Sequence, residues 1–290
     1  MTTGFKKLAK AYAWLGKFSI SLPVALTTFT GYLLAYRGFS YEVLFPVAGV
    51  FLLASGASAL NQVQEYKIDL LMPRTRNRPI PSGRISLTGA WIFIFIFSLS
   101  GLALLFFYSG YIAGILGLLN IFWYNGIYTP LKRTTAFAVV PGSIVGALPP
   151  LIGWVAAGGS LLDSASIALG FFFFIGQIPH FWLLLLRFGK EYEMAGLKSL
   201  TTHFNNVQIR RLTFVWIAAT AVVAFMLPGF YRFNHTAIIY ILWILSVFLV
   251  IIFIGLIKPS KEDVEFRTSF IRINIYYFYV MVLLCLDVLL

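Results

Sequence analysis

Cysteine and charge are both scarce in this chain. Cys285 is the single cysteine among 290 residues, so the composition excludes an intrachain disulfide and a cysteine-based metal site. Charged residues make up only 11% of the chain, against 60% hydrophobic residues and a mean hydropathy of +0.87, which lies far outside the globular range. These scarcities exclude an ordinary soluble domain and predict that most of the chain is surrounded by lipid.

Long apolar runs are what the sequence has instead. They approach the roughly 20 residues that a helix needs to cross a bilayer core, and they are continuous rather than alternating, which favours helices over a barrel. Residues 1 to 17 carry lysines ahead of an apolar stretch, as a secretion signal does, but no small-residue cleavage pattern follows, so we expect this stretch to be the first span. We predict an all-α integral membrane bundle, a single domain over residues 1 to 290, with spans near 17 to 36, 41 to 60, 87 to 107, 111 to 128, 137 to 157, 165 to 186, 212 to 228, 236 to 257 and 270 to 289.

The basic residues predict how this bundle lies in the membrane. Nine spans put the termini on opposite sides, and with the N-terminus inside, 20 of the 22 lysines and arginines fall in cytoplasmic segments. Only Arg37 and Arg232 fall outside, in agreement with the positive-inside rule. The inner residues are Lys6, Lys7, Lys10, Lys17, Lys67, Arg74, Arg76, Arg78, Arg84, Lys132, Arg133, Arg187, Lys190, Lys198, Arg210, Arg211, Lys258, Lys261, Arg267 and Arg272. We therefore expect a cytoplasmic N-terminus and an external C-terminus.

Two inner segments are longer and more polar than topology requires, residues 61 to 86 and residues 187 to 211. The net charge of +12 is dispersed over short segments without a nucleic-acid-binding module, so we do not expect nucleic acid as a partner. Loops of this length usually carry function, whereas the outer loops, such as residues 158 to 164, are short and plain. We expect the active site to lie in the two long inner segments.

The first of these segments opens with three oxygen donors at four-residue spacing, Asn61, Glu65 and Asp69. If the second helix continues through them, neighbours lie about 5 to 6 Å apart on one face. Oxygen donors suit Mg²⁺, which commonly shares one or two carboxylates with substrate phosphates. Arg74 and Arg78 follow, and guanidinium groups suit phosphate oxygens. The pattern indicates a metal-bridged diphosphate, although an isolated ladder is also typical of a helix end that pairs with surface cations.

The residues around this ladder resemble a known signature. Residues 61 to 80 read NQVQEYKIDLLMPRTRNRPI. This is similar to the first signature of the UbiA prenyltransferase superfamily, an Asn-x3-Asp-x3-Asp ladder followed by Met-x-Arg-Thr-x-x-Arg-Pro. Glu65 stands where the family usually has Asp, which keeps the carboxylate on an arm that is longer by one methylene. The resemblance implies a bundle of nine transmembrane helices.

Two further stretches resemble the heme O synthase branch of that superfamily, the protoheme IX farnesyltransferases. Residues 128 to 133 read YTPLKR, with GALPPLIGW downstream at residues 146 to 154. Residues 177 to 182 read QIPHFW and lead into Glu191-Tyr192. Residues 197 to 200 read LKSL, where the family tends toward Pro-Met-Leu-Pro. The three ordered matches cover residues 61 to 196.

The resemblance also implies a reaction, with roles for named residues. It implies transfer of farnesyl from farnesyl diphosphate to a vinyl group of protoheme IX, with heme as a substrate and Mg²⁺ as the cofactor. The catalytic residues are then Asn61, Glu65, Asp69 and His180, of which the first three also bind Mg²⁺. The substrate-binding residues are Arg74, Arg78, Tyr128, Lys132, Arg133, Arg187, Lys190 and Glu191. A bacterial cytoplasmic (inner) membrane follows, with heme A synthase or terminal oxidase assembly as protein partners.

Alternatives remain open from the residues themselves. His180 can ligate heme iron, steer a proton or hydrogen-bond to a neighbouring helix. The same superfamily would accommodate a quinone precursor or another aromatic acceptor. A secondary transporter would also use spans broken by proline, as we expect at Pro149-Pro150, but its functional charges would lie near mid-membrane. An inactive paralogue is a further alternative, which the unusual Tyr66 and Lys67 suggest.

Overall fold

The computed structural model describes residues 2–257 and 266–290, and the regular structure in these ranges is entirely helical. Lys258 and Lys261, two of the lysines predicted to be cytoplasmic, lie outside the described residues. The principal helices are α1 (Thr2–Leu15), α2 (Phe18–Tyr36), α3 (Leu44–Asp69), α4 (Leu87–Tyr108), α5 (Tyr111–Ile121), α6 (Thr129–Leu131), α7 (Val139–Gly142), α8 (Ile144–Ala156), α9 (Ser164–Met194), α10 (Asn206–Met226), α11 (Thr236–Phe253) and α12 (Phe266–Leu289).

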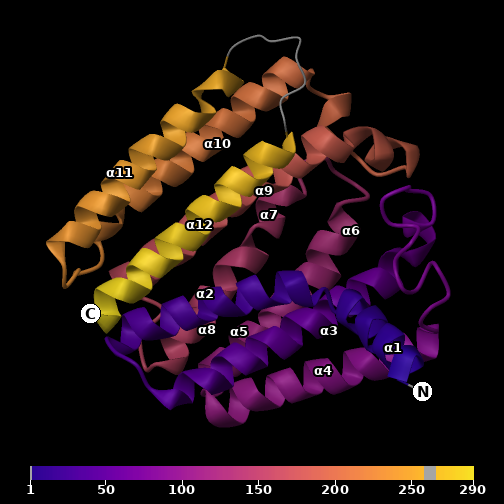
Figure 1. Cartoon of the computed structure of the whole chain (residues 1–290), viewed down its shortest axis with the longest axis horizontal. Helices are drawn as coiled ribbons and strands as arrows, with labels where there is room; N and C mark the ends of the chain where they lie inside the picture. Colours follow the sequence, from indigo (N-terminus) through magenta and orange to yellow (C-terminus); the bar gives the residue numbers. More distant parts are fainter. Residues whose placement is uncertain (1, 258–265) are drawn as a thin grey trace.

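Within the described ranges nine helical segments are long and apolar enough to cross a membrane, as the sequence predicts. They are Phe18–Tyr36, Tyr41–Asp69, Leu87–Tyr108, Tyr111–Leu131, Val139–Ala156, Ser164–Leu184, Asn206–Gly229, Thr236–Leu256 and Arg267–Leu289. The N- and C-termini lie at opposite ends of the bundle, as an odd number of spans requires (Figure 1). The predicted all-helical bundle is therefore confirmed.

Two helices extend further into the long inner segments than we predicted. α3 continues through residues 61 to 69, as the ladder argument requires, and α9 continues through residues 187 to 194. The chain leaves α9 at Gly196, whose φ of 73° lies in the left-handed region that ends many helices. Residues 61 to 69 and 187 to 194, which we expected within long loops, therefore form the ends of α3 and α9. The helical backbone sets the spacing of the side chains there.

The helix break expected at Pro149-Pro150 is wrong, because α8 runs uninterrupted through both prolines. A Cβ atom added to Gly31 of α2 would stand 1.9 Å from the Pro150 carbonyl oxygen, and one added to Gly153 would stand 1.9 Å from that of Thr28. Only glycine allows α2 and α8 to approach so closely. Packing against a neighbouring helix is the condition under which a membrane helix tolerates internal proline.

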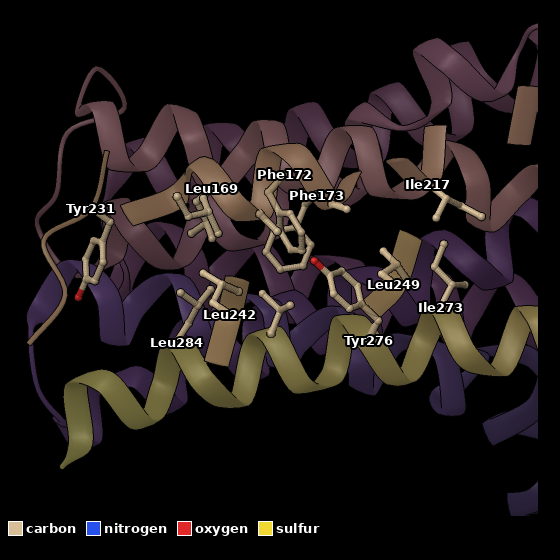
Figure 2. Packing of buried hydrophobic residues seen from close by; sticks show 14 of the residues in the cluster. Leu169, Phe172, Phe173, Ile217, Tyr231, Leu242, Leu249, Ile273, Tyr276 and Leu284 are labelled. Atoms are coloured by element: carbon tan, nitrogen blue, oxygen red, sulfur yellow. The ribbon is translucent and has the colours of Figure 1, made fainter. Parts of the chain in front are cut away.

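The most extensive apolar core among the described residues packs α9 against α10, α11 and α12. Figure 2 shows Phe172 and Phe173 of α9 at its centre, beside Tyr276 of α12. Helices α2, α3, α4, α5 and α8 form the other half of the bundle through contacts with one another. The oxygen ladder of α3 belongs to this second half, at the end where α1 and α6 also lie (Figure 1).

Candidate active site

The three ladder residues lie on one face of the last turns of α3, and all of them are buried. Asn61, Glu65 and Asp69 are 2%, 7% and 1% exposed. The side-chain amide of Asn61 donates to the Glu65 carboxylate at 3.0 Å. Buried carboxylates are costly unless they are paired or hydrogen-bonded. The surface helix end that an isolated ladder would allow is therefore wrong for this chain.

The stretch Tyr-Thr-Pro-Leu-Lys-Arg supplies the first partners of the ladder. Lys132 lies just after α6 and places its Nζ 2.6 Å from Glu65 Oε1. Thr129 accepts a hydrogen bond from the Asn61 amide at 3.1 Å. Immediately before α6, residues 122 to 128 form a π-helix, a form that is frequent at functional sites. Two segments that are far apart in the sequence thus meet at one buried point.

Tyr128 and Arg133 from the same stretch flank this point. Tyr128 is buried, and Lys132 Nζ lies 5.1 Å from the centre of its ring. The ring of Tyr128 also lies 5.9 Å from that of Phe181 on α9. Arg133 donates through Nη2 to the backbone carbonyl of Gln64 at 2.9 Å, outside the ladder face. Tyr128 therefore lies between the ladder partners and the second motif, whereas Arg133 fastens α3 from outside.

The turn that follows α3 supplies the second cation. Arg78 Nη1 donates to both carboxylate oxygens of Asp69, at 2.8 and 2.7 Å. The Thr75 hydroxyl donates to the backbone carbonyl of Asp69 at 3.0 Å, which holds the chain in the bend that brings Arg78 back. Charge-assisted hydrogen bonds of this kind are among the stronger ones in proteins. Each buried carboxylate of the ladder is thus paired with a cation from another element.

The end of α9 reaches the same turn. Glu191 accepts a hydrogen bond from the backbone N–H of Arg74 at 3.2 Å, and the Tyr192 hydroxyl accepts one from Arg74 Nη2 at 3.3 Å. The Arg74 guanidinium also lies 4.7 Å from the centre of the Phe188 ring, and that of Arg187 lies 5.0 Å from it. The two long inner segments therefore contact each other, as expected of one shared site.

His180 and Lys190 do not join this cluster. The His180 ring lies 4.5 Å from that of Phe270 on α12. Lys190 is exposed. No contact of either residue with the ladder is found within the described part of the chain. His180 therefore packs against a neighbouring helix, α12, and away from the ladder.

Lys17 and Gln62 are the site residues that sequence reasoning missed. A cavity of about 220 Å³ lies beside the ladder, and its charged lining is wholly basic: Lys17, Arg74 and Arg78. Lys17 has φ 47°, one of two positive values for non-glycine residues in residues 2–257 and 266–290. The pKa of Lys17 is lowered to about 7, chiefly by burial and next by the nearby charges of Arg78 and Lys132, while Glu65 and Asp69 raise it by less. Nothing in the sequence separates Lys17 from the cations that topology explains.

The cluster has the donor set for Mg²⁺. Within residues 2–257 and 266–290, no group of three His, Cys, Asp or Glu side chains is placed to hold a metal ion. The oxygen donors that the ladder itself could offer are its two carboxylates and the amide oxygen of Asn61. Mg²⁺ is commonly held by one or two carboxylates, with substrate phosphates and water completing its shell. The residues present therefore fit a magnesium ion that arrives together with a phosphorylated ligand.

Comparison with known proteins assigns the chain to a family. The model of the UbiA prenyltransferase family matches residues 24–279. A protoheme IX farnesyltransferase of Oleidesulfovibrio alaskensis is 37% identical over 231 residues, which cover 80% of this chain and 82% of that protein.

Solved structures share the fold. A digeranylgeranylglyceryl phosphate synthase superposes with a TM-score of 0.77 at 17% identity, over 97% of this chain and 99% of that one. A UbiA homolog from Archaeoglobus fulgidus, bound to GPP and Mg²⁺, superposes with a TM-score of 0.68 at 14% identity, over 94% of this chain and 99% of that one. The resemblance drawn from the motifs is confirmed, and this multi-pass membrane protein, whose described residues include nine apolar helices, belongs to the UbiA prenyltransferase family.

Proposed function

We propose that this chain transfers the farnesyl group of farnesyl diphosphate to a vinyl group of protoheme IX and so forms heme O. The observation that carries the proposal is the similarity to protoheme IX farnesyltransferases, 37% identity over 80% of the chain in one case. The meeting of the ladder with Lys132 and Arg78 supports it, because oxygen donors and cations converge there as a metal-bridged diphosphate requires.

The diphosphate is the part of the donor that the cluster can recognise. Asn61, Glu65 and Asp69 would hold Mg²⁺, whose chemistry is to neutralise phosphate oxygens. Lys132 and Arg78, now on the carboxylates, lie within reach of the same anion and can turn toward it. Arg74 and Lys17 line the adjoining cavity, and the UbiA homolog solved with GPP and Mg²⁺ is consistent with such a donor.

Neutralising the diphosphate promotes the reaction. When the allylic C–O bond breaks, its electron pair leaves with the diphosphate, and the cations of the cluster stabilise that charge in a site with little water. The terminal vinyl carbon of heme then forms a C–C bond with farnesyl C1. The cation left on the vinyl group takes up water and loses a proton, which gives the hydroxyethylfarnesyl product. The farnesyl tail occupies the apolar interior of the bundle.

The proposal places the cluster on the cytoplasmic side of a bacterial inner membrane. Its support is the 20-to-2 division of basic residues that a cytoplasmic N-terminus gives. Heme A synthase and terminal oxidase assembly remain the proposed protein partners. Reporter fusions after Leu290 and within residues 74 to 84 should report opposite compartments, and a common compartment would contradict this topology.

Reconstituted protein tests the acceptor. With farnesyl diphosphate, Mg²⁺ and protoheme IX, chromatography of the extracted hemes should reveal a more hydrophobic heme, and omission of Mg²⁺ should abolish it. Parallel reactions with a hydroxybenzoate and a naphthoate address the alternative of an aromatic quinone precursor. If these are prenylated while heme is unchanged, the heme assignment fails and only the family assignment remains.

A further inference from the structure

α1 lies outside the nine spans and has two unlike faces. Phe5, Leu8, Tyr12 and Leu15 recur at spacings of three and four residues, which places them on one side of the helix. Lys6, Lys7 and Lys10 fall on the opposite side, and α1 contains no acidic residue. A helix of this pattern is typical of segments that lie in the plane of a membrane surface.

The last turns of α1 are docked on the protein. Leu15 is fully buried, and the ring of Tyr12 stacks on that of Phe93 in α4 at 5.7 Å. The side-chain amide of Gln62, next to the first ladder residue, donates to the backbone carbonyls of Trp14 and Leu15 at 3.2 and 2.8 Å. This half of the apolar face therefore has its partner within the chain.

The first turns continue the same face, and it stays exposed among the described residues. Phe5 is 75% exposed and Leu8 is 49% exposed, and the three lysines opposite them are exposed as well. α4 begins at Leu87 and carries the exposed Trp91 one turn later, so α1 docks near the level at which this span would enter the bilayer. An anionic lipid surface would receive the apolar residues in its acyl boundary and the lysines among its headgroups.

We propose that α1 is an arm that binds anionic lipid headgroups and thereby holds one wall of the basic cavity. Its last turn supplies Ala13 and Trp14 to that wall, and Lys17 follows directly. Lipid contact at Phe5 and Leu8 would keep this turn seated on Gln62. A protein partner is less favoured, because the lysines match phosphate headgroups while the small apolar strip suits only shallow burial.

Lipid-dependent quenching of a fluorophore on α1 tests the contact without measuring prenyl transfer. Gly4 lies on α1, and a Cβ there meets no atom within 4 Å, so Gly4→Cys in a Cys285→Ser background accepts a single label without removing a native contact. In nanodiscs of phosphatidylcholine containing about 30% phosphatidylglycerol and brominated acyl chains, the label should be strongly quenched. Quenching should be weak in phosphatidylcholine alone, and about 0.5 M salt should reduce it in the anionic discs.

The lysines provide the matched comparison. Lys6→Gln/Lys7→Gln/Lys10→Gln should weaken the contact roughly a hundredfold, about fivefold for each charge, and so remove most of the extra quenching. Lys67→Gln/Lys198→Gln/Arg211→Gln removes the same charge from exposed positions outside α1 and should leave quenching unchanged. Equal quenching in neutral and anionic discs, or full quenching in the α1 variant, would overturn the proposal even if heme is farnesylated normally.

Discussion

Buried carboxylates occur at both ends of the bundle, but they are satisfied in different ways. At the ladder end, side-chain cations from other elements pair with Glu65 and Asp69. At the opposite end, Asp287 of α12 is fully buried and accepts from the backbone N–H groups of Asn234 and His235, at 2.9 to 3.1 Å. These amides belong to the start of α11, where a helix favours negative charge.

The difference separates a site from a structural anchor. Backbone amides at a helix start are fixed, so we expect Asp287 to hold α11 against α12. Lysine and arginine side chains can rotate toward another anion without unfolding a helix, so under the proposed function the pairs at the ladder would be exchanged for a metal and a diphosphate. We therefore expect changes at the ladder to affect turnover, and changes at Asp287 to affect stability.

Asp69→Asn should give the largest effect. The variant keeps the size of the side chain but loses the anion that would hold Mg²⁺ and orient Arg78, so turnover should fall roughly a hundredfold or more. Labelled farnesyl transfer to heme in nanodiscs measures it, with gel filtration as the check on folding. Glu65→Gln should behave in the same way. Unchanged Mg²⁺-dependent turnover in both variants would place the metal elsewhere.

Asp287→Asn should do the reverse. It weakens two charge-assisted bonds to backbone amides in a buried place, which should cost about 1 to 3 kcal/mol of stability. Thermal unfolding in detergent should therefore begin at a lower temperature, while turnover per folded molecule stays at the original level. A variant with full stability and slowed turnover would remove the contrast between the two ends.

Lys132→Met tests whether a ladder cation serves the substrate. Losing a charge-assisted hydrogen bond costs about 1.5 kcal/mol or more, so the KM for farnesyl diphosphate should rise about tenfold. The exposed Lys67 lies on α3 between the two ladder carboxylates and provides the control, since Lys67→Met should leave KM unchanged. Equal effects of the two substitutions would indicate only a general loss of positive charge.

The sequence predicted the bundle, and it named several residues that the structure brings together in the candidate site, for physical reasons. Span length and charge asymmetry can be read from short stretches of sequence. The four-residue spacing of the ladder by itself places the three residues on one helix face. Lys17 was missed because its role depends on a cavity that only tertiary packing creates. Asp287 went unnoticed for the same reason, since the amides that it accepts from lie more than fifty residues earlier. The helix break predicted at Pro149-Pro150 was wrong because α8 is supported there by close packing against α2, which is distant in the sequence.

His180→Ala examines a buried polar group that belongs to neither end. Because His180 contacts α12 and not the ladder, its loss should spare donor binding. If the imidazole also faces heme, farnesylation should fall about tenfold, as expected for one lost hydrogen bond or ligand. Separate measurements of farnesyl diphosphate binding and of the heme product distinguish the two steps. His180→Gln keeps a polar side chain of similar size but not the imidazole, so farnesylation should stay as low as in His180→Ala.

The smallest expected effect concerns pH and Lys17. Burial, with Arg78 and Lys132 nearby, lowers the pKa of Lys17 to about 7, while Glu65 and Asp69 oppose this in part. Above that pH the free protein loses the charge that a diphosphate would favour, so the KM for farnesyl diphosphate should rise severalfold as the pH increases from about 7 to 9. Lys17→Arg keeps its charge and should flatten this rise.

Stability provides a control of opposite sign. Between the folded and unfolded pKa values of Lys17, the unfolded chain binds the proton and the folded chain does not, so the contribution of Lys17 to stability increases with pH in this range. Weaker donor binding beside unchanged or increased stability would therefore be due to Lys17, whereas an identical KM profile in Lys17→Arg would remove this residue from the site.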